Sequence, residues 1–325
     1  MRVVYFGTPA FAVPALEAVA SKFQVTLVIA QPDRPKGRGR ALAAPPVKEA
    51  ALARGIPVLQ VESPNGAATL GALQALGADV FVVVAYGAIL SKELLAVPKL
   101  GAINLHASLL PRYRGASPIQ AALLDGLTET GVSTMWMDEG LDTGDVIATR
   151  VLAIEPEETA GELSARLGAL GAALLVETLA AVEAGTATRT PQDHARATVT
   201  KKIRKSAGDV DFKAPATRVH DRVRAMTPWP GATVLFQGEP VRLVRTRVVA
   251  DAAVASNPHP VAPGTVLGPG PTGGLLVACG EGALEVQRVT PAGKAEMDAQ
   301  AWWRGLRIEH AEAPRLTTPR SEEPS

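Results

Sequence analysis

The sequence predicts an α/β protein in which a mostly parallel sheet is followed by a smaller antiparallel β domain. Two observations carry this prediction. Over residues 1–185, short apolar runs of strand length alternate with stretches of helical periodicity, which is typical of a parallel sheet with helices on both faces. Beyond residue 205, short β-type runs follow one another with glycine and proline between them, which is typical of a small barrel or sandwich.

Local composition assigns the strands and helices of the first half. Thr8 and Pro9, after the opening apolar run, suit the N-cap and first turn of a helix. A long helix over residues 160–183 is followed by Gly185, a suitable residue to end it. The expected strands cover residues 3–6, 25–30, 58–59, 80–85, 102–105, 132–137 and 146–154, and the other expected helices cover residues 9–20, 46–54, 67–76, 92–97 and 118–124.

The second half has a different pattern. Residues 186–200 are rich in Thr, Pro and Gln, as linkers are. Residues 314–325 are polar and carry prolines, which suits a frayed tail. The β-type runs between them cover residues 233–236, 241–249, 264–267, 275–278 and 283–289. We therefore expect a first domain over residues 1–185, a linker over 186–205, a β-barrel domain over 206–313 and a flexible tail over 314–325.

Composition narrows the class of protein. With 47% hydrophobic residues the chain can bury a sizeable core, which excludes global disorder. No apolar run approaches the roughly 20 residues of a membrane helix, and the chain opens on a strand-like run rather than on a signal peptide. We expect a soluble cytoplasmic protein with no membrane contact and no obligate protein partner.

The single cysteine and the charge distribution add two constraints. Cys279 lies in an apolar run. Because it is the single cysteine, an intramolecular disulfide and a cysteine zinc site are excluded. Its apolar surroundings suit a small buried hydrophobe better than a nucleophile.

The formal net charge is +1, yet residues 201–308 carry 15 Lys and Arg against 9 Asp and Glu. This excess indicates a polyanionic partner for the second half, although an excess of this size also arises by ordinary variation.

Two polar residues end an apolar strand and are candidates for chemistry. Asn104 and His106 are two positions apart, so their side chains lie on the same face of the strand. They also fall at its carboxyl end, where open α/β sheets place their ligands. The alternative is that both residues merely cap the turn that follows.

Three further segments favour the chemical interpretation. The loop from Ser108 to Gly115 is dense in polar and conformationally special residues. Residues 138–145 hold four carboxylates, with glycines that let main-chain amides approach a ligand. Their order does not match a calcium loop, so we predict no metal. Residues 82–90 form a buried strand that runs into a glycine turn at the same edge of the sheet.

An amide, an imidazole and a carboxylate at one sheet edge suit direct acyl transfer. Asn104 can donate its amide hydrogens to a developing oxyanion, and a protonated His106 supplies a second donor. Asp142 would hold His106 and accept, directly or through water, the proton lost by an attacking amine. Ser108 is a poor candidate nucleophile, because no Gly-x-Ser-x-Gly elbow precedes a helix here.

These segments resemble the signature of the 10-formyltetrahydrofolate-dependent formyltransferases. The matching motifs are Asn-Leu-His at 104–106, Ser-Leu-Leu-Pro at 108–111 and Leu-Asp-Thr-Gly-Asp at 141–145, and the resemblance covers nearly the whole chain. It implies a Rossmann-like formyltransferase domain, a C-terminal barrel similar to an OB fold, and 10-formyltetrahydrofolate as formyl donor. It also implies that Asn104, His106 and Asp142 are the catalytic trio. The folate contacts implied by the resemblance are Tyr86, Gly87, Ile89, Leu90, Ser108, Leu109, Leu110, Pro111, Asp138 and Gly140.

Other segments indicate the acceptor, because the trio is shared by family members that act on glycinamide ribonucleotide, UDP-sugars or water. Residues 31–40 form a basic loop that is long for a connection between strand and helix. It resembles the insertion that members acting on methionyl-tRNA press against the acceptor stem. A solvated turn is the alternative. The basic run at 201–205 resembles the same members, as does the segment 227–232. There we expect Trp229, which is flanked by prolines, to be a domain-packing anchor rather than a base-stacking platform.

The resemblance therefore implies initiator methionyl-tRNA as the partner, formylated to N-formylmethionyl-tRNA for translation initiation. The implied tRNA contacts are Arg34, Lys36, Arg38, Arg40, Lys201, Lys202, Arg204 and Lys205. Two alternatives remain. One is the same chemistry on a UDP-aminosugar or water, which would use the same trio. The other is a non-catalytic RNA-binding protein on the same scaffold, which would have no use for Asn104, His106 and Asp142 together.

Overall fold

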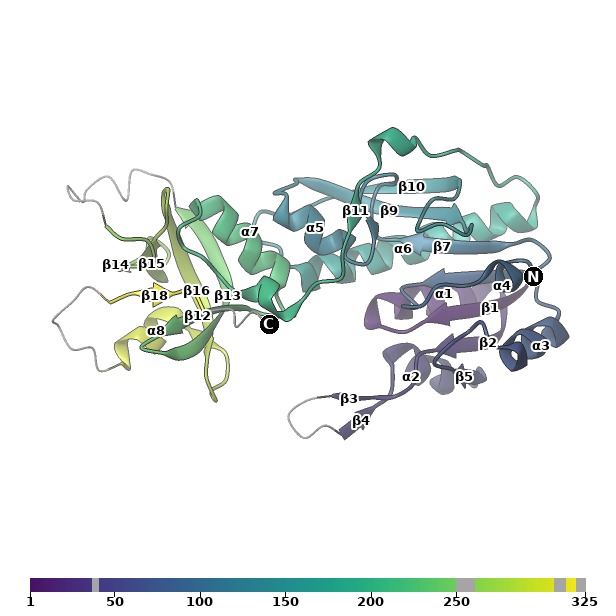
Figure 1. Ribbon diagram of the computed structural model, residues 1–325, viewed down its shortest axis with the longest axis horizontal. Helices are drawn as coiled ribbons and strands as arrows, with labels where there is room; N and C mark the ends of the chain where they lie inside the picture. Colours follow the sequence, from purple (N-terminus) through teal and green to yellow (C-terminus); the bar gives the residue numbers. More distant parts are fainter. Residues whose placement is uncertain (37–40, 250–260, 307–313, 320–325) are drawn as a thin grey trace, which may run out of the picture. The chain divides into compact units, whose positions relative to one another are not determined.

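The computed structural model describes residues 1–36, 41–249, 261–306 and 314–319, and Figure 1 traces their helices and strands. They form two compact units. The first comprises Met1–Pro118, Glu129–Ala153 and Ser164–Thr200, and the second comprises Ile119–Thr128, Ile154–Leu163 and Lys201–Ser325. Two short segments from the first half of the chain thus belong to the second unit, a division that the sequence patterns did not predict.

The first unit is built on a seven-stranded sheet. Its strands are β1 (Arg2–Gly7), β2 (Gln24–Ala30), β5 (Val58–Gln60), β6 (Val80–Val84), β7 (Ala102–His106), β9 (Glu129–Trp136) and β10 (Val146–Ala153). In the order β10-β9-β7-β6-β1-β2-β5, the last five strands are parallel, whereas β9 and β10 pair antiparallel at one edge. This confirms the predicted α/β fold with a mostly parallel sheet.

Helices cover the faces of this sheet, which is why its parallel strands consist mainly of apolar residues. Tyr5, Phe6 and Ile103 have no exposed surface. A Cβ added to Gly171 would lie 2.8 Å from Leu105 Cδ2, so the longest helix packs directly on β7. The helices of the first half are η1 (Ala10–Ala12), α1 (Val13–Lys22), α2 (Pro46–Ala53), α3 (Ala67–Leu76), α4 (Lys92–Leu95), α5 (Pro118–Leu124) and α6 (Ala160–Glu183).

The order of the strands creates a switch point beside β1. The chain adds β2 and β5 on one side of β1, and then returns to add β6 and β7 on the other. Loops at the carboxyl edge diverge at such a point and leave room for a ligand. Thr8 Oγ1 donates to the main-chain oxygen of Tyr86 at 2.9 Å, which joins the loops that follow β1 and β6.

The helix α6 is, among the described residues, the one helix long and apolar enough to cross a membrane by length and composition alone. Half of its apolar stretch is buried inside the protein, and a core helix meets the same test. The expectation that no apolar run approaches this length is therefore wrong. Arg166 and the glycines 168 and 171 interrupt the run in the sequence but do not interrupt the helix.

Residues 186–200 belong to the first unit rather than to a separate linker. The strand β11 (Val199–Thr200) pairs in parallel with β8 (Arg114–Gly115), Thr190 bridges Val146, and Gln192 is buried. The polar composition that suggests a linker instead supplies side chains that hydrogen-bond to neighbouring loops.

The second unit contains a curled antiparallel sheet in the order β14-β15-β16-β13-β12-β18, with β17 on β16. Its strands are β12 (Ala232–Phe236), β13 (Glu239–Val249), β14 (Val266–Pro269), β15 (Leu275–Ala278), β16 (Ala283–Pro291), β17 (Met297–Asp298) and β18 (Leu316–Thr317). The two ends of the sheet meet, because Val266 N donates to Pro314 O at 2.9 Å and Leu316 N donates to Gly264 O at 2.8 Å. This agrees with the barrel-like second domain that the sequence predicts.

The closing strand corrects the expected tail. Leu316 is buried, so residues 314–319 complete the barrel and only the remainder of the expected tail lies outside the described residues. The remaining elements after α6 are η2 (His194–Arg196) in the first unit, and η3 (Lys205–Gly208), α7 (Ala216–Met226) and α8 (Ala299–Arg304) in the second.

The basic loop of the first half begins and ends as a small hairpin. The strand β3 (Arg34–Lys36) pairs antiparallel with β4 (Ala41–Ala43). Two of the residues predicted to contact tRNA, Arg38 and Arg40, fall between these strands in the sequence and lie outside the described residues.

Candidate active site

The two polar residues of β7 lie at the carboxyl end of the strand, as predicted. Asn104 is paired with Val83 of β6 and Met135 of β9, so it lies between two neighbouring strands. The loop between β9 and β10 carries Asp142. The structure thus brings together Asn104, His106 and Asp142. In the sequence, Asp142 follows Asn104 by 38 positions and His106 by 36.

The carboxylate of Asp142 is held by two donors. Its Oδ1 accepts a hydrogen bond from Asn104 Nδ2 at 3.3 Å, and its Oδ2 accepts one from the main-chain nitrogen of Gly115 at 2.7 Å. The side chain is buried, and its backbone has a φ of 53° in the left-handed region. A carboxylate fixed on both oxygens has a defined direction relative to its neighbours.

His106 is buried beside this carboxylate, with Nδ1 at 3.6 Å from Asp142 Oδ2. Its other nitrogen, Nε2, lies 2.9 Å from the main-chain oxygen of Tyr113. Since a carbonyl oxygen only accepts, Nε2 carries a hydrogen. Sequence reasoning predicts His106 as a donor to an oxyanion. The structure refines this prediction, because Nε2 is already engaged and only Nδ1 remains for a substrate.

Strained backbone is concentrated around these side chains. Among the described residues, four non-glycine residues have a positive φ, and three of them are Ala85 after β6, Tyr113 and Asp142. Such conformations cost about 1–3 kcal/mol each and persist where surrounding contacts fix them, often at functional sites. Gly115, with a φ of 99°, admits no side chain, because a Cβ would lie 2.5 Å from Thr200 O.

Ser108 braces the loop after β7. Its hydroxyl donates to Arg112 O at 2.6 Å, and its main-chain oxygen accepts from Ser133 Oγ at 2.7 Å. The side chain has no exposed surface. A nucleophile needs a base within reach, whereas the Ser108 hydroxyl donates to a main-chain oxygen. Ser108 therefore shapes the loop. Its side chain has no exposed surface through which to make the implied contact with folate.

The other implied folate contacts divide by exposure. The side chains of Tyr86 and Leu90 are buried, and the Tyr86 ring packs edge-on against Phe6 at 5.4 Å between centroids. In contrast, Ile89 is 75% exposed and Leu141, next to Asp142, is 54% exposed. Gly87, Asp138 and Gly140 are exposed, and Leu109, Leu110 and Pro111 are half-buried.

The acidic loop between β9 and β10 is organised by its own side chains. Asp138 Oδ1 accepts from Gly140 N at 3.0 Å and from Thr143 Oγ1 at 2.6 Å, and Glu139 forms an ion pair with Lys92 at 2.8 Å. Over the described parts of the chain, no group of three or more His, Cys, Asp and Glu side chains is arranged to hold a metal ion.

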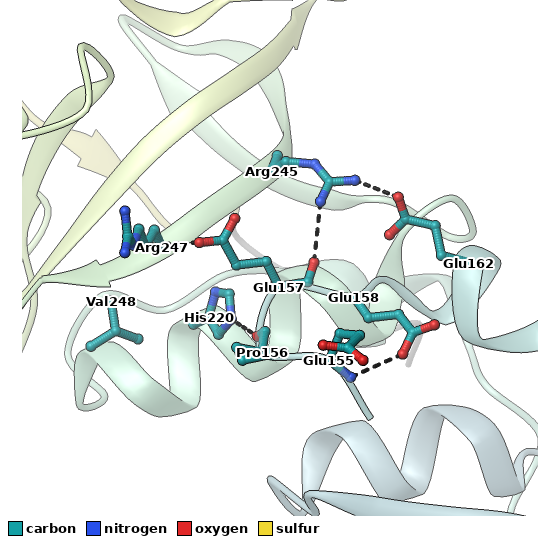
Figure 2. A pocket seen from close by; sticks show the side chains of 9 residues that line it. All are labelled: Glu155, Pro156, Glu157, Glu158, Glu162, His220, Arg245, Arg247 and Val248. Carbon is teal, nitrogen blue, oxygen red and sulfur yellow. Dashed lines mark hydrogen bonds and ion pairs between the residues drawn. The ribbon is translucent and has the colours of Figure 1, made fainter. Parts of the chain in front are cut away.

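A hollow lies wholly within residues of the second unit. Its volume is about 680 Å³. Figure 2 shows the side chains that line it, among them Glu157, Glu162, His220, Arg245 and Arg247. Its charges pair internally, since Arg245 contacts Glu162 and Arg247 lies 3.4 Å from Glu157. Both ring nitrogens of His220 are engaged, with Thr246 Oγ1 and Pro156 O at 2.9 Å each. Most of the charged groups that line the hollow are therefore already engaged with one another.

The basic residues predicted to contact tRNA are exposed wherever the structure describes their side chains. Arg34 belongs to β3, and Lys201, Lys202, Arg204 and Lys205 begin the last segment of the second unit. These four second-unit cations form no ion pair with any residue that the structure describes. Only the backbone of Lys36 is described.

The prediction for Trp229 is wrong, because its side chain is 57% exposed and does not act as a buried packing anchor.

Sequence reasoning gave no role to two buried residues near the trio, Arg114 and Gln192. Gln192 Nε2 donates to the main-chain oxygens of Asp142 and Gly144 at 2.9 and 2.7 Å. Arg114 lies in the polar loop from Ser108 to Gly115, but nothing in the sequence indicates burial of its guanidinium. Gln192 lies in residues 186–200, which the sequence predicts to be a linker, and a glutamine there does not indicate burial.

Comparison with known proteins finds relatives over nearly the whole chain. The family model "Formyl transferase" matches residues 1–179, and "Formyl transferase, C-terminal domain" matches residues 202–307. A curated methionyl-tRNA formyltransferase from Solibacter usitatus is 47% identical over 95% of this chain and 96% of its own. Another from Roseiflexus sp. is 45% identical over 96% of this chain and 94% of its own.

The chain belongs to the methionyl-tRNA formyltransferase family. This confirms the family indicated by the motifs around Asn104, Ser108 and Asp142. A solved sugar 3N-formyl transferase, WlaRD, crystallised in the presence of dTDP and 5-N-formyl-THF, has the same fold. It matches with a TM-score of 0.64 and 15% identity, covering 91% of this chain and 99% of that one.

Proposed function

We propose that this chain transfers the formyl group of 10-formyltetrahydrofolate to the amino group of initiator methionyl-tRNA. The product is N-formylmethionyl-tRNA, which is used for translation initiation in the cytoplasm. The observation that carries the proposal is the Asp142 carboxylate, fixed by Asn104 and Gly115 beside His106 at the carboxyl edge of the sheet. The names of relatives 45–47% identical to this chain support the choice of acceptor.

The trio can lower the barrier at both ends of the reaction. The amine nitrogen attacks the formyl carbon, and the formyl oxygen gains negative charge. The second hydrogen of Asn104 Nδ2 can be donated to that oxygen, because only one is used by Asp142. As the tetrahedral species collapses, the bond from carbon to the folate nitrogen breaks, and that nitrogen takes up a proton.

The proton lost by the amine needs an acceptor close to the formyl carbon. Asp142 supplies a carboxylate whose direction is fixed, and it can accept the proton directly or through water. His106 Nδ1, 3.6 Å from Oδ2, adds a charge-assisted donor when it is protonated. Because His106 Nε2 is tied to Tyr113 O, the ring can present only this nitrogen.

The residues around the trio fit a folate. Its pterin ring is flat and partly apolar, and Ile89 and Leu141 expose large apolar side chains on the two loops that adjoin the site. The main-chain groups around Gly87 and Gly140 are accessible on the same loops. A fold-level neighbour crystallised with 5-N-formyl-THF supports a reduced folate as donor.

The exposed cations suit the polyanionic acceptor. Arg34 and Lys36 in the hairpin, with Arg38 and Arg40, would contact phosphate or unpaired bases of the acceptor arm. Lys201, Lys202, Arg204 and Lys205 would add a salt-sensitive phosphate interaction.

An acceptor comparison tests the proposal. The wild-type chain is given 10-formyltetrahydrofolate with methionyl-tRNA, uncharged tRNA, a UDP-aminosugar or no acceptor, and formylated product is counted. We expect product with methionyl-tRNA alone. Product on the UDP-aminosugar, or release of formate at the same rate without acceptor, would reassign the acceptor. Absence of product in all four would point to the non-catalytic alternative.

A further inference from the structure

A buried pair of side chains, Arg114 and Gln192, connects three segments around the candidate site. Gln192 Oε1 accepts from Arg114 Nε at 3.1 Å and from Arg114 Nη2 at 2.7 Å. Gln192 Nε2 donates to Asp142 O at 2.9 Å and to Gly144 O at 2.7 Å. All these residues belong to the first unit. One amide thus links the acidic loop to β8 through the segment that follows α6.

The orientation of this amide is fixed by chemistry. A guanidinium can only donate and a main-chain carbonyl can only accept. Exchanging the oxygen and nitrogen of Gln192 would therefore oppose donor to donor at Arg114, and acceptor to acceptor at both Asp142 and Gly144. Buried polar groups that are fully satisfied make a network rigid, and a partly satisfied one is costly.

The same network reaches the trio at two more points. Arg114 begins β8, where its neighbour Gly115 donates its main-chain N–H to Asp142 Oδ2 at 2.7 Å. Its other neighbour, Tyr113, accepts from His106 Nε2. The left-handed backbone of Asp142 is held by Gln192 at its carbonyl, while its side chain is held by Gly115. Both ends of Asp142 are therefore tied to the Arg114 segment.

We infer that Gln192 and Arg114 are positioning residues for Asp142 and His106. They touch no reacting atom, and they act by fixing the acidic loop and the loop after β7 relative to each other. The inference rests on the proposed function, because it assumes that Asp142 and His106 serve the formyl transfer. A displacement of a catalytic group by about 1 Å can cost about 100-fold in rate, so loss of this link should lower kcat rather than substrate binding.

Gln192→Leu tests the link, because leucine keeps an apolar stem of similar size and lacks both polar atoms. We expect kcat to fall by about 30- to 100-fold, with the KM for methionyl-tRNA and for formyl-folate changed by less than about 3-fold. Asp193→Ala is the matched control. The Asp193 side chain caps its own turn by accepting from Ala195 N, so kcat should stay within about 2-fold of wild type.

Gln192→Glu separates positioning from simple support of the fold, and it also serves if the leucine variant does not fold. A carboxylate keeps the acceptor for Arg114 but opposes the oxygens of Asp142 and Gly144. Protonation restores one donor in the same shape. The kcat of Gln192→Glu relative to wild type should therefore rise as the pH falls, whereas that of Gln192→Leu should not.

Wild type, assayed alongside, distinguishes failure of the proposed function from failure of the positioning role of Gln192. Wild type that makes no formylmethionyl-tRNA contradicts the proposed function. Active wild type with Gln192→Leu at full kcat, or with Gln192→Glu lacking any recovery in acid, overturns the role of Gln192. A folded Gln192→Leu variant that raises KM while keeping kcat overturns it as well.

Discussion

The main-chain N–H of Gly115 donates to Oδ2 of Asp142 at 2.7 Å, and this bond joins the loop after β7 to the loop between β9 and β10. It is made by a residue that must be glycine, because its φ is 99° and Thr200 O occupies the place of a side chain. The carboxylate is thus oriented by a main-chain donor that substitution can only move and not remove.

Gly115→Ala is expected to reduce both stability and activity. A left-handed backbone costs an L-residue about 1–2 kcal/mol, and a Cβ 2.5 Å from Thr200 O forces β8 away from β11. Gly273→Ala is the control, since Gly273 has a φ of 90° with nothing within 4 Å of its added Cβ. We expect Gly273→Ala to unfold at a lower temperature while its kcat stays that of wild type, and Gly115→Ala to lose both stability and kcat. Equal kcat in the two variants would show that Gly115 does not orient Asp142 for the reaction.

Lys201→Ala and Lys202→Ala are expected to weaken use of tRNA without changing chemistry on bound substrate. Each lost phosphate contact lowers the dependence of log affinity on log salt by about 0.7–0.9. The KM for methionyl-tRNA should rise at moderate salt while kcat is kept. Lys213→Ala removes another exposed cation of the second unit and is the comparison. If all three variants behave alike, the effect belongs to total charge and not to this segment.

Arg38→Ala should lower formylation of methionyl-tRNA and leave slow, tRNA-independent hydrolysis of formyl-folate unchanged. The reason is that residues 31–40 are proposed to contact the acceptor and not the donor. Rates of both reactions, measured on the same preparation, check this. A parallel loss of the two rates would show that the loop supports the folate side of the site.

Cys279 should resist thiol reagents in the native protein. Its side chain is 7% exposed, and burial raises the pKa of its thiol to about 12. Only roughly one thiol in ten thousand is then ionised at pH 8, and the thiolate is the reactive form. Iodoacetamide should leave the native chain unmodified and fully active, and label one site per chain in denaturant, since there is one cysteine. Rapid labelling with loss of activity would contradict the buried, inert role.

The parts of the site that could be predicted are those with a local pattern. Asn104 and His106 follow a two-residue period at the end of an apolar strand, and Asp142 lies in a recognisable acidic motif. The parallel sheet likewise follows from apolar runs that are buried on both faces. Each of these features needs only neighbouring residues to be recognised.

The parts that could not be predicted depend on contacts between distant segments. Arg114 meets Gln192 across 78 positions, and Gly115 meets Thr200 across a similar separation. No periodicity in the sequence marks such pairs. Gln192 is therefore predicted to belong to a linker, because the residues around it are rich in Thr, Pro and Gln. The prediction for Trp229 uses only its local sequence. A tryptophan between prolines is typical of a packing residue, yet this one is exposed.

Single-turnover formyl transfer to methionyl-tRNA by Asp142→Asn and by His106→Ala tests the central claim most directly. An asparagine offers one acceptor where Asn104 and Gly115 need two, and alanine removes the ring beside it. Each variant should lose about 10³-fold or more in rate, with thermal unfolding that still shows a folded chain. A rate near that of wild type in either folded variant would contradict the assignment of the trio.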